Sequence, residues 1–214
     1  MGAVDHETPV YLHQLPVPGE DRYASLALAN TRFTVSHGEV DLLDDTGAAH
    51  LWLVRHELLP DRIALNGRQS GRLRALREAL RVLFAARSAG TPPPPAALGT
   101  LNDALAAAPA TPRLAWGADG PRRADLPDSG NPAAAALSLL AEDAADLLTG
   151  ADAAQLTECA AQGCARWFLR SHGARRWCTT KCGNRVRAAR AYAARKAGSP
   201  QEHPSEIQSS PTGH

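Results

Sequence analysis

The sequence has few of the β-branched and aromatic residues that favour strands. Its 214 residues include only 8 valines and 2 isoleucines, and aromatic side chains make up 5%, whereas there are 42 alanines and 27 leucines. Because alanine and leucine favour helices and β-branched and aromatic residues favour strands, this composition excludes a mostly β protein. We expect a mainly α fold that is large enough to bury a core.

Long hydrophobic runs and an export signal are also missing. No apolar segment approaches the roughly 20 residues that cross a bilayer. Residues 1–9 carry Asp5 and Glu7 and lack the basic-then-apolar pattern of a signal peptide. We therefore expect a cytoplasmic protein that has no membrane partner.

Acidic residues are missing from one segment of the chain. Residues 159–197 contain eight arginines, two lysines and no aspartate or glutamate, whereas residues 1–158 contain 13 basic and 20 acidic residues, a net charge of −7. The overall net charge of +1 hides this asymmetry. A basic segment attached to an acidic body predicts that the segment binds an anionic partner.

Periodic apolar positions predict helices through the first 150 residues. The clearest helix covers residues 70–88, in which leucines recur every three or four positions. Asn131 and Pro132 are typical of a helix N-terminus, and Gly150 ends that helix. A hairpin is expected over residues 113–126, which makes the body α+β with a short β-hairpin. Further helices are predicted over residues 23–30, 51–59 and 98–108.

The segments outside these elements are expected to be irregular. Residues 1–20 are predicted to form an arm, residues 38–47 a turn-rich connection and residues 198–214 a disordered tail. A polar cluster in the body fits no metal or catalytic template and is interpreted as a surface loop; it comprises His37, Asp41, Asp44, Asp45 and His50. This pattern does not predict an enzyme.

All four cysteines of the chain lie within 24 positions, as Cys159, Cys164, Cys178 and Cys182. Two short-spaced pairs joined by a longer connection are typical of a structural zinc site with four thiolate ligands. Gly163 permits a tight turn in the first pair, and the i, i+4 spacing of the second pair suits the start of a helix. Four sulfur ligands leave no position for a reacting water, so we expect one structural zinc ion per chain.

Other uses of the cysteines remain open from the sequence. Two disulfides would need an oxidising compartment, a redox dithiol usually has the spacing Cys-x-x-Cys, and an iron–sulfur cluster also takes four thiolates. His172 could replace one cysteine as a ligand, but we expect it to be exposed at a hairpin tip.

A treble-clef-like zinc finger is expected around the cysteines. Residues 166–169 and 175–178 are predicted to pair as a hairpin, followed by a helix that carries the last ligands. This segment is too small to build much of a hydrophobic core. Metal binding would therefore supply most of its folding free energy, about 10 kcal/mol. The expected miniature core consists of Trp167, Phe168, Trp177 and Val186.

Residues 184–197 are rich in alanine and arginine and predict a basic helix. Val186, Ala189 and Ala193 are expected to face the zinc module, with arginines on the opposite side in solvent. A solvated charged face is the ordinary interpretation of such a helix. The lack of balancing acidic residues favours an anionic partner instead, and arginine suits bidentate contacts with phosphate or guanine.

Two parts of the chain resemble known families. Residues 175–185 (RRWCTTKCGNR), the Cys159–Cys164 segment and the Arg-rich stretch around Tyr192 resemble the CGNR zinc-finger family of bacterial transcription regulators. Upstream, residues 26–32 (LALANTR), 41–43, 51–53 and 73–84 are similar to the ABATE-type domain that usually precedes this finger.

The resemblance implies three parts: an ABATE-like helical domain over residues 1–150, a zinc finger with a basic helix over residues 151–197, and the tail. It also implies a regulator that binds double-stranded DNA, while residues 1–150 dimerise or sense an unidentified signal. The alternative is an adaptor that binds RNA or an acidic protein. The candidate nucleic-acid contacts are Arg175, Arg176, Lys181, Arg185, Arg187, Arg190 and Arg195.

Overall fold

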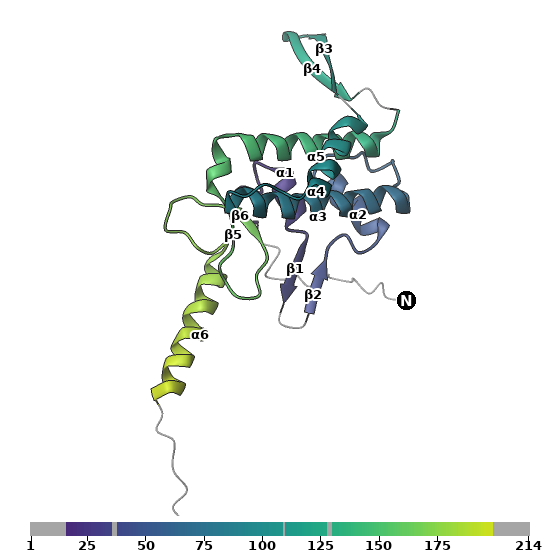
Figure 1. The fold of residues 1–214 in the computed structure, drawn as a ribbon. Helices are drawn as coiled ribbons and strands as arrows, with labels where there is room; N and C mark the ends of the chain where they lie inside the picture. Colours follow the sequence, from purple (N-terminus) through teal and green to yellow (C-terminus); the bar gives the residue numbers. More distant parts are fainter. Residues whose placement is uncertain (1–15, 36–37, 109, 128–129, 199–214) are drawn as a thin grey trace, which may run out of the picture.

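The computed structural model describes residues 16–35, 38–108, 110–127 and 130–198. The body contains α1 (Ala24–Ala29), β1 (Arg32–Val35), β2 (Gly38–Asp41), α2 (Thr46–Arg55), α3 (Gly67–Ala89), α4 (Pro95–Ala107), β3 (Ala110–Gly117), β4 (Gly120–Pro127) and α5 (Pro132–Thr149). A short 3-10 helix (Ala151–Gln155), β5 (Leu156–Glu158), β6 (Trp167–Leu169) and α6 (Thr180–Gly198) follow. The predicted fold, mainly helical with a small cysteine-bearing unit that ends in a helix, is confirmed (Figure 1). The expected tail after residue 198 and the first 15 residues of the expected arm lie outside the described residues.

Helix α3 forms the centre of the body and confirms the prediction for residues 70–88. Asn66 and Gln69 form a capping box at its N-terminus, and Gly90 ends it in the left-handed conformation. Its predicted apolar stripe is buried. Helix α3 contacts α1, α2, α4 and α5, so the core lies between these helices. Among the described residues, no helix is both long and apolar enough to cross a membrane.

Helix α5 begins and ends as the sequence predicts. The side chain of Asn131 accepts a hydrogen bond from the N–H of Ala134 (3.2 Å), Pro132 is the first helical residue, and Gly150 follows the last. Its apolar face packs against α3 and α4. A carboxylate on the same helix, Asp143, accepts a hydrogen bond from the N–H of Ser25 (2.8 Å) and so caps α1, which has no side-chain cap of its own.

The prediction for residues 38–59 is wrong in two respects. Residues 38–41 form a strand that pairs antiparallel with β1, from Arg32 opposite Asp41 to Val35 opposite Gly38. Helix α2 begins at Thr46, because Asp45 caps it through the N–H of Ala48 (2.7 Å), and it ends at Arg55. The apolar residues 51–59 therefore cover the end of a helix and a loop, and periodicity alone does not locate the boundary between them.

The prediction that Asp41 belongs to a surface loop is wrong, because this residue has a structural role. Its carboxylate receives two hydrogen bonds from the guanidinium of Arg77, whose side chain is only 3% exposed. Burial on its own raises the pKa of Asp41, but the hydrogen bonds from Arg77 and from the N–H of Leu43 outweigh it, and the pKa is lowered. This ion pair fastens the β1–β2 hairpin to α3.

The predicted hairpin near residue 118 is confirmed and is longer than expected. Strands β3 and β4 pair from Ala110 opposite Pro127 to Gly117 opposite Gly120. It projects from one end of the body, at the opposite end from α6 (Figure 1).

Candidate metal centre

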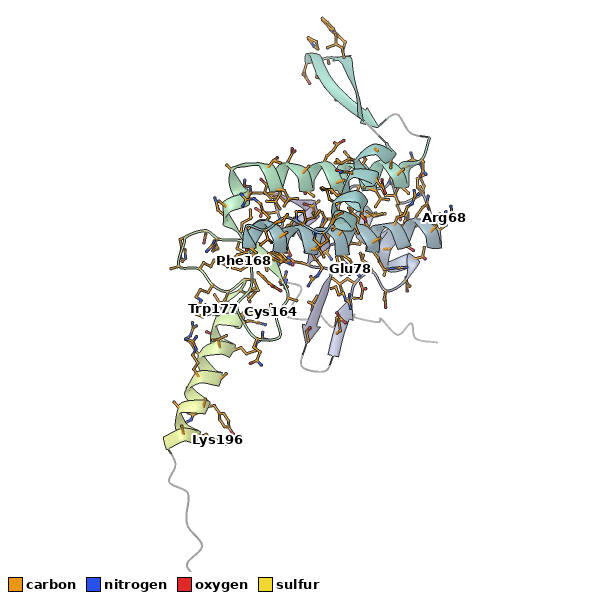
Figure 2. All side chains as sticks on the ribbon, viewed as in Figure 1. Arg68, Glu78, Cys164, Phe168, Trp177 and Lys196 are labelled. Atoms are coloured by element: carbon orange, nitrogen blue, oxygen red, sulfur yellow. The ribbon has the colours of Figure 1, made fainter. Side chains whose placement is uncertain are left out.

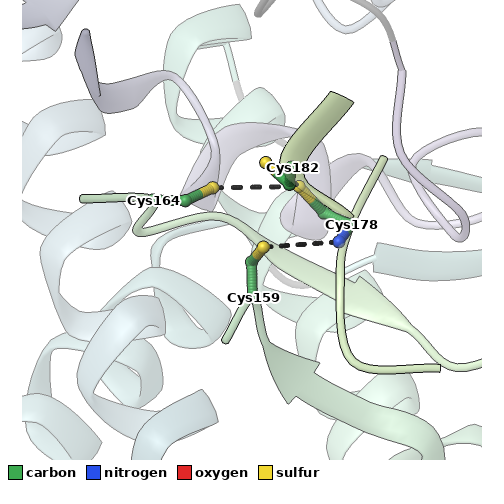
Figure 3. A group of neighbouring side chains, drawn as sticks. All are labelled: Cys159, Cys164, Cys178 and Cys182. Carbon is green, nitrogen blue, oxygen red and sulfur yellow. Dashed lines mark hydrogen bonds between the residues drawn. The ribbon is translucent and has the colours of Figure 1, made fainter. Parts of the chain in front are cut away.

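The four cysteines converge on one point, as their spacing predicts. All four Sγ atoms lie within 4.8 Å of one another (Figure 3). The Sγ of Cys178 lies 3.8 Å from that of Cys164 and 3.6 Å from that of Cys182. Cys159, Cys178 and Cys182 are buried, and Cys164 is partly buried.

The separations fit one tetrahedral zinc ion. Four thiolates that each bind Zn²⁺ at about 2.3 Å have sulfur–sulfur distances of about 3.8 Å, close to the two distances observed. A disulfide would need roughly 2.05 Å, and all four residues are free cysteines. An iron–sulfur cluster places several atoms between the thiolates and would hold them farther apart. The cluster can therefore bind one zinc ion, which would cross-link the finger and supply no reacting position.

The first ligand pair is positioned by the end of β5 and a tight turn. The N–H of Cys159 donates to the carbonyl of Arg166 (2.9 Å), which continues the β5–β6 pairing by one residue. The N–H of Cys164 donates to the carbonyl of Ala161 (2.9 Å), and Gly163 takes a φ of +72° in that turn. The prediction that glycine permits this turn is confirmed.

The second ligand pair spans the start of α6. Cys178 precedes the helix, and its N–H donates to the Sγ of Cys159 (3.4 Å). The hydroxyl of Thr179 accepts a hydrogen bond from the N–H of Cys182 (3.3 Å), in the manner of a helix N-cap. Helix initiation thus fixes the spacing between the two sulfurs.

The close contacts among Cys159, Cys164 and Cys178 shift the pKa values of their thiols. Hydrogen bonds from Cys164 and Cys178 lower the pKa of Cys159. The pKa values of Cys164 and Cys178 are raised, in both cases chiefly by the hydrogen bond with Cys159. Negative charges this close repel one another, so a bound divalent cation is what would allow all four sulfurs to be thiolates.

Strand pairing in the finger differs from the prediction. Strand β6 pairs with β5, from Leu156 opposite Leu169 to Glu158 opposite Trp167, and residues 175–178 form no strand. His172 is exposed in the connection and is not part of the cysteine cluster. The partner of β6 was missed because β5 is only three residues long and carries no alternating pattern.

The two faces of β6 serve different cores, which corrects the expected miniature core. Trp167 packs into the body, where its ring lies edge-on to Phe84 at 6.0 Å. Phe168 points the other way and packs with Val17 and the cysteines, while Trp177 and Val186 lie at the edge of this small cluster. Val17 comes from the N-terminal segment for which the sequence predicts an irregular arm.

The residues of the Cys-Gly-Asn-Arg signature hold the finger together. A Cβ atom at Gly183 would lie 3.1 Å from the indole of Trp177, so glycine allows this close contact. Asn184 accepts a hydrogen bond from Arg187, whose guanidinium lies over the ring of Trp177 at 5.9 Å. Arg185 donates to the carbonyl of Gln162 (3.1 Å) and so connects α6 to the first cysteine turn.

Arg175, a candidate nucleic-acid contact, is half-buried within the finger. Its guanidinium donates to the carbonyls of Trp177 (3.2 Å) and Cys178 (2.8 Å) and lies 5.6 Å from the ring centre of Phe168. The sequence carries no signal for this role, because the carbonyls come together only after folding. The other candidates, Arg176, Lys181, Arg185, Arg187, Arg190 and Arg195, are exposed.

Helix α6 leaves the zinc module after its second turn. Val186 is partly buried, but Ala189 and Ala193 are exposed, so the prediction that all three face the module is wrong beyond Val186. Figure 2 shows the helix extending from the finger, past Trp177 at its base, to Lys196 at its far end. Tyr192 on this part is 64% exposed.

The finger is joined to the body by a buried polar network. Asn30 is hydrogen-bonded through its side chain to the main chain of Trp167 and to Glu20. Glu20 also accepts from Arg166 (3.0 Å), whose side chain is 7% exposed. The finger is therefore held against the body by these hydrogen bonds and is not joined to it by a flexible linker alone.

Two protein families match the chain. Residues 23–151 match ABATE, described as "Putative stress-induced transcription regulator". Residues 155–196 match the CGNR zinc finger and include all four cysteines. Neither family is an enzyme class, and no curated protein matches the chain. Both resemblances are confirmed, and the chain belongs to the ABATE family and carries a C-terminal CGNR zinc finger.

Proposed function

We propose that this chain is a cytoplasmic transcription regulator whose zinc site holds α6 in position to bind double-stranded DNA. The observation that carries the proposal is the exposure of the outer part of α6, where every side chain from 187 to 197 is exposed. A helix without an apolar contact face gains little from packing. Its arginines repel one another as well, so an anionic partner would stabilise it.

The dimensions of α6 suit the major groove. Its 19 residues correspond to a length of about 28 Å at 1.5 Å per residue. A helix of about 10–12 Å diameter enters a groove roughly 12 Å wide. Because α6 extends away from the body (Figure 1), a duplex can approach it without meeting the body, whose net charge is negative.

The basic residues of α6 divide between two sides of the helix. At 100° per residue, Lys181, Arg185 and Arg195 fall on one side together with Tyr192, while Arg187 and Arg190 fall on another. Arg187 is held in place by Asn184 and Trp177. Such a preordered guanidinium suits a bidentate contact with guanine, so we assign base reading to Arg187 or Arg190.

The remaining candidates are assigned to phosphate contacts. Arg176, Lys181 and Arg195 are exposed around the base and the far end of the helix. Arg175 and Arg185 already donate to main-chain carbonyls, so their main part in this proposal is to hold the finger in shape next to the backbone. The helical body would dimerise or respond to a signal.

Selection of binding sites from random duplex DNA by the zinc-loaded full chain, at a fixed salt concentration, tests the proposal. We expect enriched sites that Arg187→Ala/Arg190→Ala no longer binds tightly. The matched control is Arg62→Ala/Arg68→Ala, which removes the same charge from exposed positions on the body; Figure 2 shows Arg68 far from α6. Equal losses in both variants, or no enriched duplex together with binding of RNA or an acidic protein, would favour the adaptor.

A further inference from the structure

The β3–β4 hairpin carries an apolar surface at its tip. Residues that lie opposite each other in the register share a face, and so do alternate residues along a strand, which places Leu114, Trp116 and Pro121 on one face. Leu114 is 73% and Trp116 is 77% exposed. A two-stranded hairpin is marginally stable by itself, and clustered exposed apolar side chains are typical of an interaction site.

An apolar hollow of matching character lies at the root of the same hairpin. Its volume is about 480 Å³, and α3, α4 and α5 line it, chiefly through Ala75, Leu76, Ala104, Ala107 and Leu137. For comparison, a cavity of roughly 150 Å³ can hold a benzene molecule. The hollow is therefore large enough for an indole ring. Ala107 and Asn131, which also lines it, flank the hairpin in the sequence.

We propose that this surface joins two copies of the chain, with the hairpin tip of each copy filling the hollow of the other. Each strand has eight residues, so the tip stands about 26 Å from the root, and Figure 1 shows it pointing away from the body. When two such hairpins lie side by side and antiparallel about a two-fold axis, each tip meets the root of the other. That is where the hollow lies, and such an interface is closed and self-complementary.

The charges around the two surfaces are complementary. Asp119 is exposed in the turn at the tip, and Arg72 and Asp103 are exposed at the rim of the hollow. Asp119 of one copy can therefore pair with Arg72 of the other. Opposite charges at an interface rim fix register and orientation more than they add affinity.

The area available implies a dimer that dissociates on dilution. One hairpin face is roughly 26 Å long and 10 Å wide. Two hairpins docked in two hollows therefore bury on the order of 1,000 Å² in total, near the lower limit of specific interfaces. We expect a dissociation constant in the micromolar range, with Trp116 as the main anchor.

Sedimentation velocity of the zinc-loaded full chain over a dilution series tests the proposal. We expect a reversible dimer whose dissociation constant rises by at least about 100-fold in Trp116→Ser, since each dimer loses two anchors. Ala107→Arg should also dissociate it by filling the hollow from an exposed position. Leu51→Ser, at an equally apolar position that is 65% exposed on α2, should leave it unchanged.

Cross-linking distinguishes a hairpin that docks into the hollow of a second chain from one that folds back into the hollow of its own chain. A mixture of Trp116→Cys and Ala107→Cys chains should form a disulfide between two chains, whereas neither variant should do so alone. The proposal is overturned by a chain that stays monomeric at high concentration, by a dimer that Trp116→Ser leaves intact, or by a disulfide within the diluted double variant. A monomer in which Trp116→Ser weakens duplex binding would instead make the hairpin a nucleic-acid contact.

Discussion

The side-chain amide of Asn30 pairs with the main chain of Trp167 as a neighbouring strand would. Its Nδ2 donates to the carbonyl of Trp167 (2.8 Å), and its Oδ1 accepts from the N–H of Trp167 (2.7 Å). The two residues are 137 positions apart, and both are buried. One side chain of the ABATE domain thus satisfies both main-chain groups at the edge of β6, between the body and the cysteine ligands.

Replacing Asn30 with alanine should destabilise the whole chain by about 2–4 kcal/mol. The substitution leaves two buried main-chain groups without partners, each at a cost of about 1–3 kcal/mol. Urea unfolding followed by circular dichroism measures the loss. Asn102→Ala, at an exposed position of α4, should change stability by no more than a few tenths of a kcal/mol, and a similar small effect for Asn30→Ala would contradict the assignment.

The purified chain should contain one zinc ion, and Cys178→Ala should lose it. Because the metal supplies most of the folding free energy of so small a unit, hydrogen exchange should become fast in α6 and the first cysteine turn, while α3 and α5 stay protected. Elemental analysis gives the metal content. His172→Ala is the matched control and should keep its zinc; zinc loss in this control, or an iron–sulfur absorption band in the wild type, would refute the site.

Gly183→Ala should weaken the finger by about 1–3 kcal/mol, because the added methyl group meets the Trp177 indole at 3.1 Å. Gly71→Ala is the matched control. It lies inside α3, where an added Cβ meets no atom within 4 Å, so it should stabilise the chain by up to about 1 kcal/mol. Thermal melts of the zinc-loaded proteins compare the two variants. Equal shifts in melting temperature would show that the contact with the indole does not limit which residue fits at position 183.

The free energy of unfolding of the chain should fall at acidic pH, and part of this fall should come from protonation of Asp41. Its pKa is lowered in the folded state, so its contribution is present above the pKa of an unfolded aspartate, about 3.9, and is lost as the pH falls through the folded value. Asp41→Asn should cost about 2–4 kcal/mol at pH 7, because Arg77 is buried and loses this partner, and should flatten the acid dependence. Asp61→Asn, an exposed control, should change neither quantity.

Binding of duplex DNA should depend steeply on salt. Each phosphate contact contributes a slope of about −0.9 in log affinity against log salt, so four to six contacts predict a slope of about −4 to −5 for one finger. Removing a phosphate contact such as Lys181 should flatten the slope by about one unit for all sequences. Removing the base reader should instead cost about 1–3 kcal/mol at one base pair. A slope near zero would exclude backbone contacts.

The sequence by itself determined the secondary structure that local rules encode. The apolar period located α3, the Asn131–Pro132 pair located the start of α5, and the pattern of residues 113–126 located the β3–β4 hairpin. Cysteine spacing predicted the ligand set, since the turn at Gly163 and the helix start at Thr180 are local structures. These features need few distant contacts, so the residues next to them in the chain suffice.

Tertiary structure alone decided the features that join distant segments. It placed β5 beside β6, Trp167 in the body, Val17 under the cysteines and Asp41 against Arg77. It also placed the guanidinium of Arg175 against main-chain carbonyls inside the finger and left the outer part of α6 without a contact face. Strands of three or four residues carry too little pattern to be located locally, and a charged side chain finds its partner only when the fold brings the two together. A domain boundary at residue 150 is a prediction from the sequence. In the structure, Leu156, Trp167 and Leu169 follow this residue in the chain and complete the core of the body.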